Sequence, residues 1–275
     1  MPYYRSSGTL PEPCKTAMKH IRYYTGFLLM LCCFTESRAQ EFITKARIEY
    51  EKKVNMRREL TKQHMPQDGI DRFPEFQTNY FDLFFIGDQT LYKPGRQNRP
   101  PQSGNMIYIS ISGNEGARFS DFTTGKVTLR RSLMDLDYIF EDSIPPVKWK
   151  IEQETRNIAG YECRKAIGRI YDSVYVVAFY SEEFVSRGGP EGIQGLPGLI
   201  LGMAIPRYNT TWFATKVELA KIDESMIVPP TLKGKKLSRE ETKAKLLKKM
   251  QEMGNKNADA KAMDHYFKAG YFLDY

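Results

Sequence analysis

The feature that most constrains the fold is a succession of short strand-like runs between residues 81 and 222, separated by turn residues. Within residues 106–111, for example, isoleucine occupies every second position, and this alternation predicts a strand with one buried face. No helix-period pattern lies between successive runs, which argues against the crossover helices of a parallel sheet. We therefore predict a mainly β (α+β) protein with one large antiparallel sheet that forms an open half-barrel. Closure of the sheet into a barrel is the alternative.

The sheet should contain roughly eight to eleven strands, joined by turns such as Gly87-Asp88 and Pro145-Pro146. Residues 157–180 are expected to form two long strands around a turn at residues 171–173. The other expected strands are residues 81–85, 90–92, 106–111, 126–129, 138–140, 149–152, 199–205 and 211–222.

The first forty residues have the pattern of a secretory signal peptide. Basic residues precede an apolar run over residues 27–34, and Ser37 and Ala39 stand at the −3 and −1 positions of a cleavage site. The run is too short for a membrane-spanning helix, which needs about 20 apolar residues. We expect residues 1–39 to be removed by cleavage near Ala39. The mature chain would then lie in the periplasm or at the periphery of the outer membrane.

Two alternatives concern the same leader. Translation from Met18 would still leave a complete signal peptide. A lipoprotein signal would require lipidation of Cys32 or Cys33, but Leu31 is larger than the small residue expected before Cys32, and Cys33 fits only slightly better. After cleavage at Ala39, the sequence retains one cysteine.

Charge divides the mature chain into two parts. Residues 40–230 hold 25 basic and 25 acidic residues, whereas residues 231–275 hold 11 basic and six acidic ones. Because the excess lies in one tail of an exported chain, nucleic acid is not an expected partner. We predict a β-rich domain over residues 40–230 and a basic helical tail over residues 231–275.

The tail contains a helix signal. Ser238 and Glu241 form a capping box, and Leu246, Met250 and Met253 follow on one helical stripe. A second, weaker helical stretch covers residues 258–268. One interpretation is a helix docked loosely on the sheet with a solvated lysine-rich face. The other is peripheral association with the outer membrane, or with an acidic partner, through residues 238–253.

Signatures of catalysis and metal binding are missing from the sequence. The mature chain retains only His64 and His265, far apart, which argues against a histidine-rich metal site. There is no phosphate loop, nucleophile elbow or H-E-x-x-H motif. Adjacent acids at residues 141–142 and 182–183 are more typical of solvated turns than of a catalytic pair. We expect no catalytic, metal or cofactor site; a hydrolase built from carboxylates on distant strands is the alternative.

The remaining thiol belongs to Cys163, in a predicted strand where Tyr161 and Lys165 share its face. A single cysteine in an oxidising compartment is buried, paired with another molecule or reactive. An isolated cysteine within a strand is more often a small core residue, so we expect Cys163 to be inert. The reactive alternative rests on nearby basic residues that would favour the thiolate.

Residues 188–202 are rich in glycine and carry large apolar side chains. We interpret them as a buried corner in which a loop packs against the sheet, with the wall of a ligand cleft as the alternative. In the corner interpretation, Gly198 occupies a position that excludes a side chain and Leu199 faces the core. Gly202 would allow a close approach on the opposite face.

The chain resembles the GLPGLI family, exported proteins of Bacteroidota, because residues 195–200 match its hexapeptide letter for letter. The matching residues are Gly160, Tyr161, Cys163, Tyr180, Gly189, Pro190, Gly195, Leu196, Pro197, Gly198, Leu199 and Ile200. Two features depart from the family: Phe179 stands where tryptophan is common, and Arg187-Gly188 lengthens the approach to Gly189-Pro190. The resemblance covers residues 42–230 and implies export. It also implies, by analogy, a LolA-like open barrel, but no activity.

These observations favour a non-enzymatic cell-envelope protein: a periplasmic carrier or accessory factor that binds an apolar ligand or a protein partner. The first alternative is a partner-binding subunit of an outer-membrane complex, docked through the basic tail. The hydrolase is a weaker alternative, as is an integral outer-membrane barrel suggested by the alternation of Tyr271, Leu273 and Tyr275.

Overall fold

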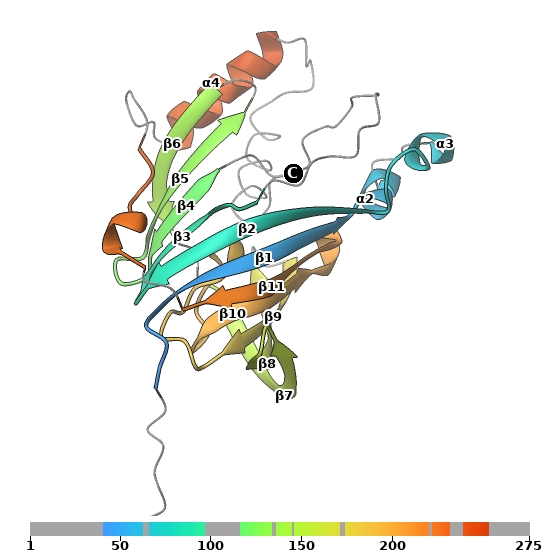
Figure 1. Cartoon of the computed structure of the whole chain (residues 1–275). Helices are drawn as coiled ribbons and strands as arrows, with labels where there is room; N and C mark the ends of the chain where they lie inside the picture. The colour runs from blue at the N-terminus through green and yellow to red at the C-terminus, as the bar shows by residue number, and fades with distance from the viewer. Residues whose placement is uncertain are drawn as a thin grey trace, which may run out of the picture. The chain divides into compact units, whose positions relative to one another are not determined.

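The computed structural model describes residues 41–62, 66–96, 116–133, 136–144, 146–170, 174–219, 222–231 and 239–252. Residues Phe42–Tyr275 form one unit and Met1–Glu41 another. The strands that the structure describes all belong to the unit Phe42–Tyr275 (Figure 1). The elements are β1 (Lys45–Asn55), α2 (Met56–Lys62), α3 (Gln67–Ile70), β2 (Phe76–Ile86), β3 (Gln89–Pro94), β4 (Ala117–Asp121), β5 (Lys126–Leu133), β6 (Leu136–Ser143), β7 (Lys148–Ile158), β8 (Tyr161–Ile170), β9 (Val174–Ser181), η1 (Pro190–Gly192), β10 (Leu199–Ile205), η2 (Pro206–Tyr208), β11 (Thr210–Glu218), η3 (Glu224–Met226) and α4 (Arg239–Glu252).

The strands form one 11-stranded antiparallel sheet in the order β6-β5-β4-β3-β2-β1-β11-β10-β9-β8-β7. Each strand pairs with its neighbours in sequence, and β1 also pairs with β11. The exception is the step from β6 to β7, which are the two edges of the sheet. The connection between them contains Pro145-Pro146, and proline cannot donate to a ladder. The predicted antiparallel sheet is confirmed, and it is open.

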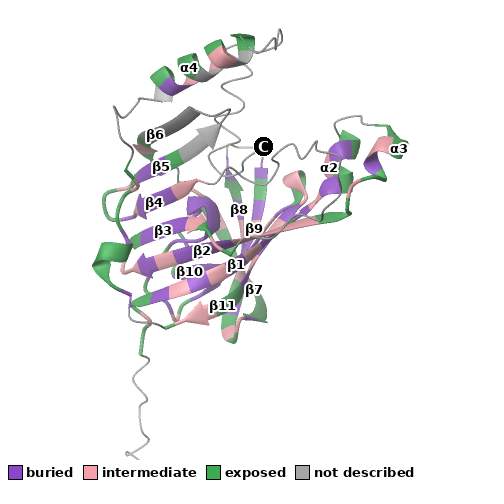
Figure 2. Ribbon diagram, turned by 45° about the horizontal axis from the view of Figure 1, so that its top comes forward, coloured by how far each residue is buried: buried purple, intermediate pink, exposed green. Residues whose placement is uncertain are grey.

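The register defines one face of the sheet, which we call the inner face. Alternate β1 residues Ala46, Ile48, Tyr50, Lys52 and Val54 are almost fully buried (Figure 2). The neighbouring strands add Phe81, Leu83 and Phe85 of β2 and Trp212 and Ala214 of β11 to this face. On the opposite, outer face, a smaller cluster of Leu91, Phe119, Ile222 and Ile227 covers part of β3 and β4.

Several predicted strand boundaries were wrong. β2, β5 and β6 are longer than the runs predicted at residues 81–85, 126–129 and 138–140. The first of the two strands predicted over residues 157–180 begins later than expected. Residues 157–158 end β7, and Ala159 and Gly160, with φ of 52° and 92°, form a tight turn before β8. The strand predicted over residues 211–222 ends at Glu218, and Ile222 lies instead in the outer cluster, since its segment crosses back over the sheet. β7 extends to Ile158, well beyond the predicted residues 149–152.

Several elements were not predicted, among them β1, β4, α2 and α3. The strand β1 was missed although its apolar residues alternate cleanly. The helix α2 begins after Asn55, whose Oδ1 accepts a 3.0 Å hydrogen bond from the backbone N–H of Arg58, as an N-cap does. Met56 and Leu60, one turn apart, are buried. The predicted strand at residues 106–111 lies outside the described residues, as do the turn at 171–173, the stretch 258–268, and Tyr271, Leu273 and Tyr275.

The predicted tail helix is confirmed as α4, which contacts β6. Thr242 is fully buried and Leu247 packs against the main core, while Lys245 and Lys248 are exposed. The side chains of Leu246 and Met250, and all of Met253, lie outside the described residues. No helix in the described ranges is long and apolar enough to cross a membrane.

Candidate functional site

The segment between β9 and β10 contains a glycine-rich loop, residues 186–198, that packs against the sheet. The backbone N–H of Ile200 donates to the carbonyl of Gly188 at 2.9 Å, and Gly195 N–H donates to Arg187 at 3.2 Å. From β7, the indole N–H of Trp149 donates to the carbonyl of Gln194 at 2.8 Å. The loop is therefore attached both to β10 and to the edge strand β7.

Most of the GLPGLI hexapeptide is core. Leu196, Leu199 and Ile200 are almost fully buried within the main cluster, whereas Gly195 and Pro197 are exposed. Gly198 has φ of 152°, and a β-carbon there would lie 2.7 Å from the carbonyl carbon of Ser181 and closer still to its oxygen. A side chain at position 198 would clash with the backbone, and the neighbouring Leu199 is buried in the protein's own core. Both observations support the structural corner.

The other motif residues also serve packing. Gly160 provides the turn between β7 and β8, and the half-buried ring of Tyr161 lies 4.7 Å from that of Phe184. Tyr180 is buried and its hydroxyl donates to Glu182 at 3.3 Å. A β-carbon at Gly189 would lie 2.7 Å from the Ile200 β-carbon.

Cys163 is fully buried. Burial, helped by the charge of Glu183, raises the pKa of its thiol to about 12. A thiol with this pKa stays protonated at neutral pH and is a poor nucleophile. The structure therefore agrees with an inert core cysteine.

Among the described residues, packing alone does not explain a buried charged cluster on the inner face, formed by Lys52, Tyr92, Arg118 and Glu191. Lys52 Nζ lies 3.7 Å from Glu191 Oε1, and both side chains are at most 5% exposed. The Tyr92 hydroxyl donates to the same carboxylate oxygen at 3.5 Å. Arg118 Nη1 donates to the backbone carbonyl of Glu191. Three strands of the sheet therefore converge on one residue of the loop.

Glu191 is held in an unusual backbone conformation. It has φ of 56° and ψ of 18° within η1, between Pro190 and Gly192. A left-handed residue other than glycine costs about 1–3 kcal/mol and persists only where its surroundings enforce it. Gly192 also has a positive φ, and a β-carbon there would lie 2.8 Å from Arg118 Cδ. The motif residues Gly189 and Pro190 thus belong to the turn that brings Glu191 to the sheet.

Aromatic rings line the cluster. Lys52 Nζ lies 5.4 Å from the centre of the Trp212 ring and 5.6 Å from that of Phe81. Phe81 and Tyr92 stack at 5.1 Å. Trp212 is fully buried, and its indole nitrogen has no hydrogen-bond partner among the described residues. Cationic side chains next to a buried indole N–H are groups that can bind a carboxylate.

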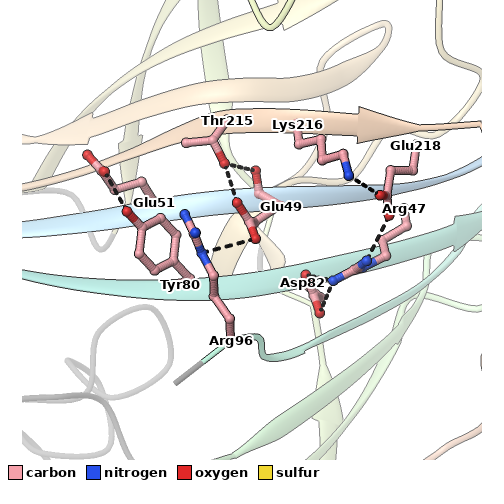
Figure 3. A network of polar contacts seen from close by, with 9 residues as sticks. All are labelled: Arg47, Glu49, Glu51, Tyr80, Asp82, Arg96, Thr215, Lys216 and Glu218. Carbon is pink, nitrogen blue, oxygen red and sulfur yellow. Dashed lines mark hydrogen bonds and ion pairs between the residues drawn. The ribbon is translucent and has the colours of Figure 1, made fainter. Parts of the chain in front are cut away.

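The outer face of the same strands carries a second polar network (Figure 3). Arg47 bridges Asp82 at 3.0 Å and Glu218 at 2.7 Å. The other contacts join Glu49 to Arg96 and Thr215, Glu51 to Tyr80, and Lys216 to Glu218. Hydrogen bonds from Lys216 and Arg47 lower the pKa of Glu218. Partly exposed pairs of this kind contribute little individually, and we assign them to the register of β1 between β2 and β11.

The acidic pairs singled out in the sequence are not brought together. Glu141 and Asp142 lie on the edge strand β6, and Glu182 follows β9 and pairs with Arg164 at 3.4 Å. Within the part of the chain that the structure describes, no three histidine, cysteine or acidic side chains are grouped as metal ligands.

Sequence reasoning missed Lys52, Tyr92, Arg118 and Glu191. A signal existed for Lys52, which occupies an inward position in the alternating apolar residues of β1. None existed for Glu191, because Gly-Pro-Glu-Gly is typical of a solvated turn.

No family model and no curated protein matches the chain. Among the solved structures with partial similarity to the chain are two of PNGF-II. The structure in the P21 space group has a TM-score of 0.46 and 14% identity, over 71% of this chain and 31% of that one. The structure in the C2 space group has a TM-score of 0.44 and 16% identity, over 70% and 30%. The chain spans less than a third of the length of either.

Proposed function

We propose that this chain is an exported, non-enzymatic cell-envelope protein of the GLPGLI type, which binds a ligand with apolar character on the inner face of its sheet. The glycine-rich loop is the element that ligand entry would displace. The observation that carries the proposal is the way this loop is held. It lies on an open sheet and meets the inner face through a buried charged cluster instead of through apolar packing alone.

A loop held in this way has the parts that a removable cover needs. Its glycines at residues 192, 195 and 198 have positive φ, so its path depends on torsions that glycine adopts easily. Among the described residues, its polar attachments come from separate elements: Lys52, Tyr92 and Arg118 on the inner face, Trp149 on β7, Ile200 on β10, and Asp88, which pairs with Arg187 of the loop. The strand pairs of the sheet do not include residues of the loop.

The basic helix favours a second candidate function, a partner-binding subunit of an outer-membrane complex. α4 contacts β6 while it presents Lys245 and Lys248 to solvent. A helix anchored in this way offers a fixed basic surface to an acidic partner or to anionic lipid.

The test is detergent-free purification of the full chain from cell envelopes, followed by mass spectrometry of bound lipids and proteins. The carrier predicts acyl-chain molecules that copurify in stoichiometric amounts and persist in a Lys245→Glu/Lys248→Glu variant. The subunit predicts a stoichiometric membrane partner that this variant loses. A protein that carries neither would contradict both functions.

Export has its own readout in the same sample. The intact mass should correspond to a chain that begins at Gln40, after cleavage behind Ala39. A retained leader, or a lipidated cysteine at the N-terminus, would refute the proposed processing.

A further inference from the structure

We propose that Lys52, Tyr92 and the indole N–H of Trp212 form a subsite for the carboxylate head of an amphipathic, single-chain acid, and that the carboxylate of Glu191 occupies the part of this subsite next to Lys52 and Tyr92 in the closed state. The inference rests on the proposed ligand-binding function and adds the chemical class of the ligand. Glu191 then acts as an internal competitor, which the ligand head replaces when the loop moves.

The first argument is that Glu191 fits the cluster loosely. Charge-assisted hydrogen bonds between nitrogen and a carboxylate are usually about 2.7–2.9 Å long. The contacts of the Glu191 carboxylate are longer, 3.7 Å to Lys52 Nζ and 3.5 Å to the Tyr92 hydroxyl. A free carboxylate is not tied to a strained backbone, so it can approach the same groups more closely.

The second argument comes from Trp212. Its ring is fully buried beside Lys52, and its N–H has no hydrogen-bond partner among the residues that the structure describes. Leaving a buried donor unsatisfied is costly, and native structures do so rarely. The ring that carries this donor lies 5.4 Å from Lys52 Nζ, so a ligand head next to Lys52 could accept from it.

The third argument is the apolar surface on both sides of Lys52. On β1, Tyr50 belongs to the main core cluster, whereas Val54 joins Met56 in a separate apolar cluster. Lys52 is the charged residue between them on the inner face. A head group held there leaves its chain on apolar side chains, which suits a molecule with one acidic end and one hydrocarbon tail.

The experiment compares dodecanoate with dodecanol, which has the same chain length and no charge. Binding to the otherwise unchanged full chain, the parent, is measured by isothermal titration calorimetry, which leaves the Trp149 hydrogen bond to the loop in place. We compare this parent with Glu191→Gln and with the double variant Lys52→Met/Glu191→Gln. Thermal unfolding confirms that each protein is folded. The double variant removes both charges together, and it keeps the comparison valid if Glu191→Gln fails to fold.

The parent should bind dodecanoate more tightly than dodecanol. Glu191→Gln should bind dodecanoate about tenfold more tightly than the parent, because the competitor is gone, with little change for dodecanol. The double variant should no longer distinguish the two molecules.

Two results would overturn the inference, and they differ in what else they overturn. If the parent and the double variant bind both molecules equally, the subsite is refuted while ligand binding on the inner face stands. If no folded protein binds either molecule, the subsite and the carrier function fail together.

Discussion

Gly198→Ala tests whether the hexapeptide is a structural corner. Two costs add at this position. With φ of 152°, the backbone lies in a region that L-residues rarely adopt, at a cost of about 1–3 kcal/mol. The new β-carbon would meet the backbone of Ser181, which is paired with Leu199 at the start of β10 and cannot move alone. Overpacking of this kind costs about 1–3 kcal/mol more.

The matched control is Gly195→Ala, in the same hexapeptide. Gly195 also has a positive φ, 100°, but its β-carbon would come no closer than 3.4 Å to a neighbour, the Trp149 indole nitrogen. Strain without a clash should cost about 1 kcal/mol. The two variants therefore separate the effect of backbone conformation from that of close packing.

The assay is thermal unfolding of the mature chain, supported by urea titration. A loss of about 4 kcal/mol should lower the Tm of Gly198→Ala by roughly 8–16 °C, since a domain of this size loses roughly 2–4 °C per kcal/mol. Gly195→Ala should fall by roughly 2–4 °C. Equal shifts in the two variants, or a near-native Tm for Gly198→Ala, would show that the corner does not hold the loop against β9.

Three further predictions use the same unfolding assays. Leu199→Ala should cost about 2–5 kcal/mol because its side chain is fully buried, whereas exposed Pro197→Ala should cost at most about 1 kcal/mol; similar losses would contradict the burial of the motif. Burial raises the pKa of the Cys163 thiol from 9.0 to about 12. The contribution of the protonated thiol to the free energy of unfolding is therefore complete below pH 9 and is lost as the pH rises towards 12. Cys163→Ala should therefore cost about 1 kcal/mol of stability at neutral pH. Between pH 9 and 12, its free energy of unfolding should fall less than that of wild type. Parallel curves of free energy against pH would argue against a buried thiol. Lys52→Met should cost about 3–5 kcal/mol by leaving Glu191 as a buried charge without its ion pair, and adding Glu191→Gln should restore most of the loss. Additive losses would mean that the two side chains do not interact.

The strands and the tail helix show how much of the fold can be predicted from local sequence pattern. The hairpin of β2 and β3 follows from two apolar runs around Gly87-Asp88, and α4 follows from the charged and apolar spacing after Ser238. These elements depend on contacts between residues close in sequence, where side-chain period and turn residues carry the information. The outer position of Ile222 is different, because it depends on where the chain returns after β11.

The candidate site divides in the same way. The glycines of the hexapeptide predicted a structural corner, since only glycine adopts such backbone torsions without strain. Their neighbour Glu191 gave no such indication, and its partners Lys52 and Arg118 lie 139 and 73 positions away in the chain. The charged cluster forms only because the sheet brings β1 and β4 under the same loop.

The sequence alone thus determined the antiparallel β class, the tail helix and the need for glycine at the corner, all of which arise from the conformational limits of single residues and near neighbours. Only the tertiary structure decided that the sheet opens between β6 and β7, that Lys52 belongs to a buried charged cluster, and that Glu191 reaches it. These features depend on strand pairing and burial between distant segments. The energy of a buried charge is set by the groups that surround it in space, which no local pattern specifies.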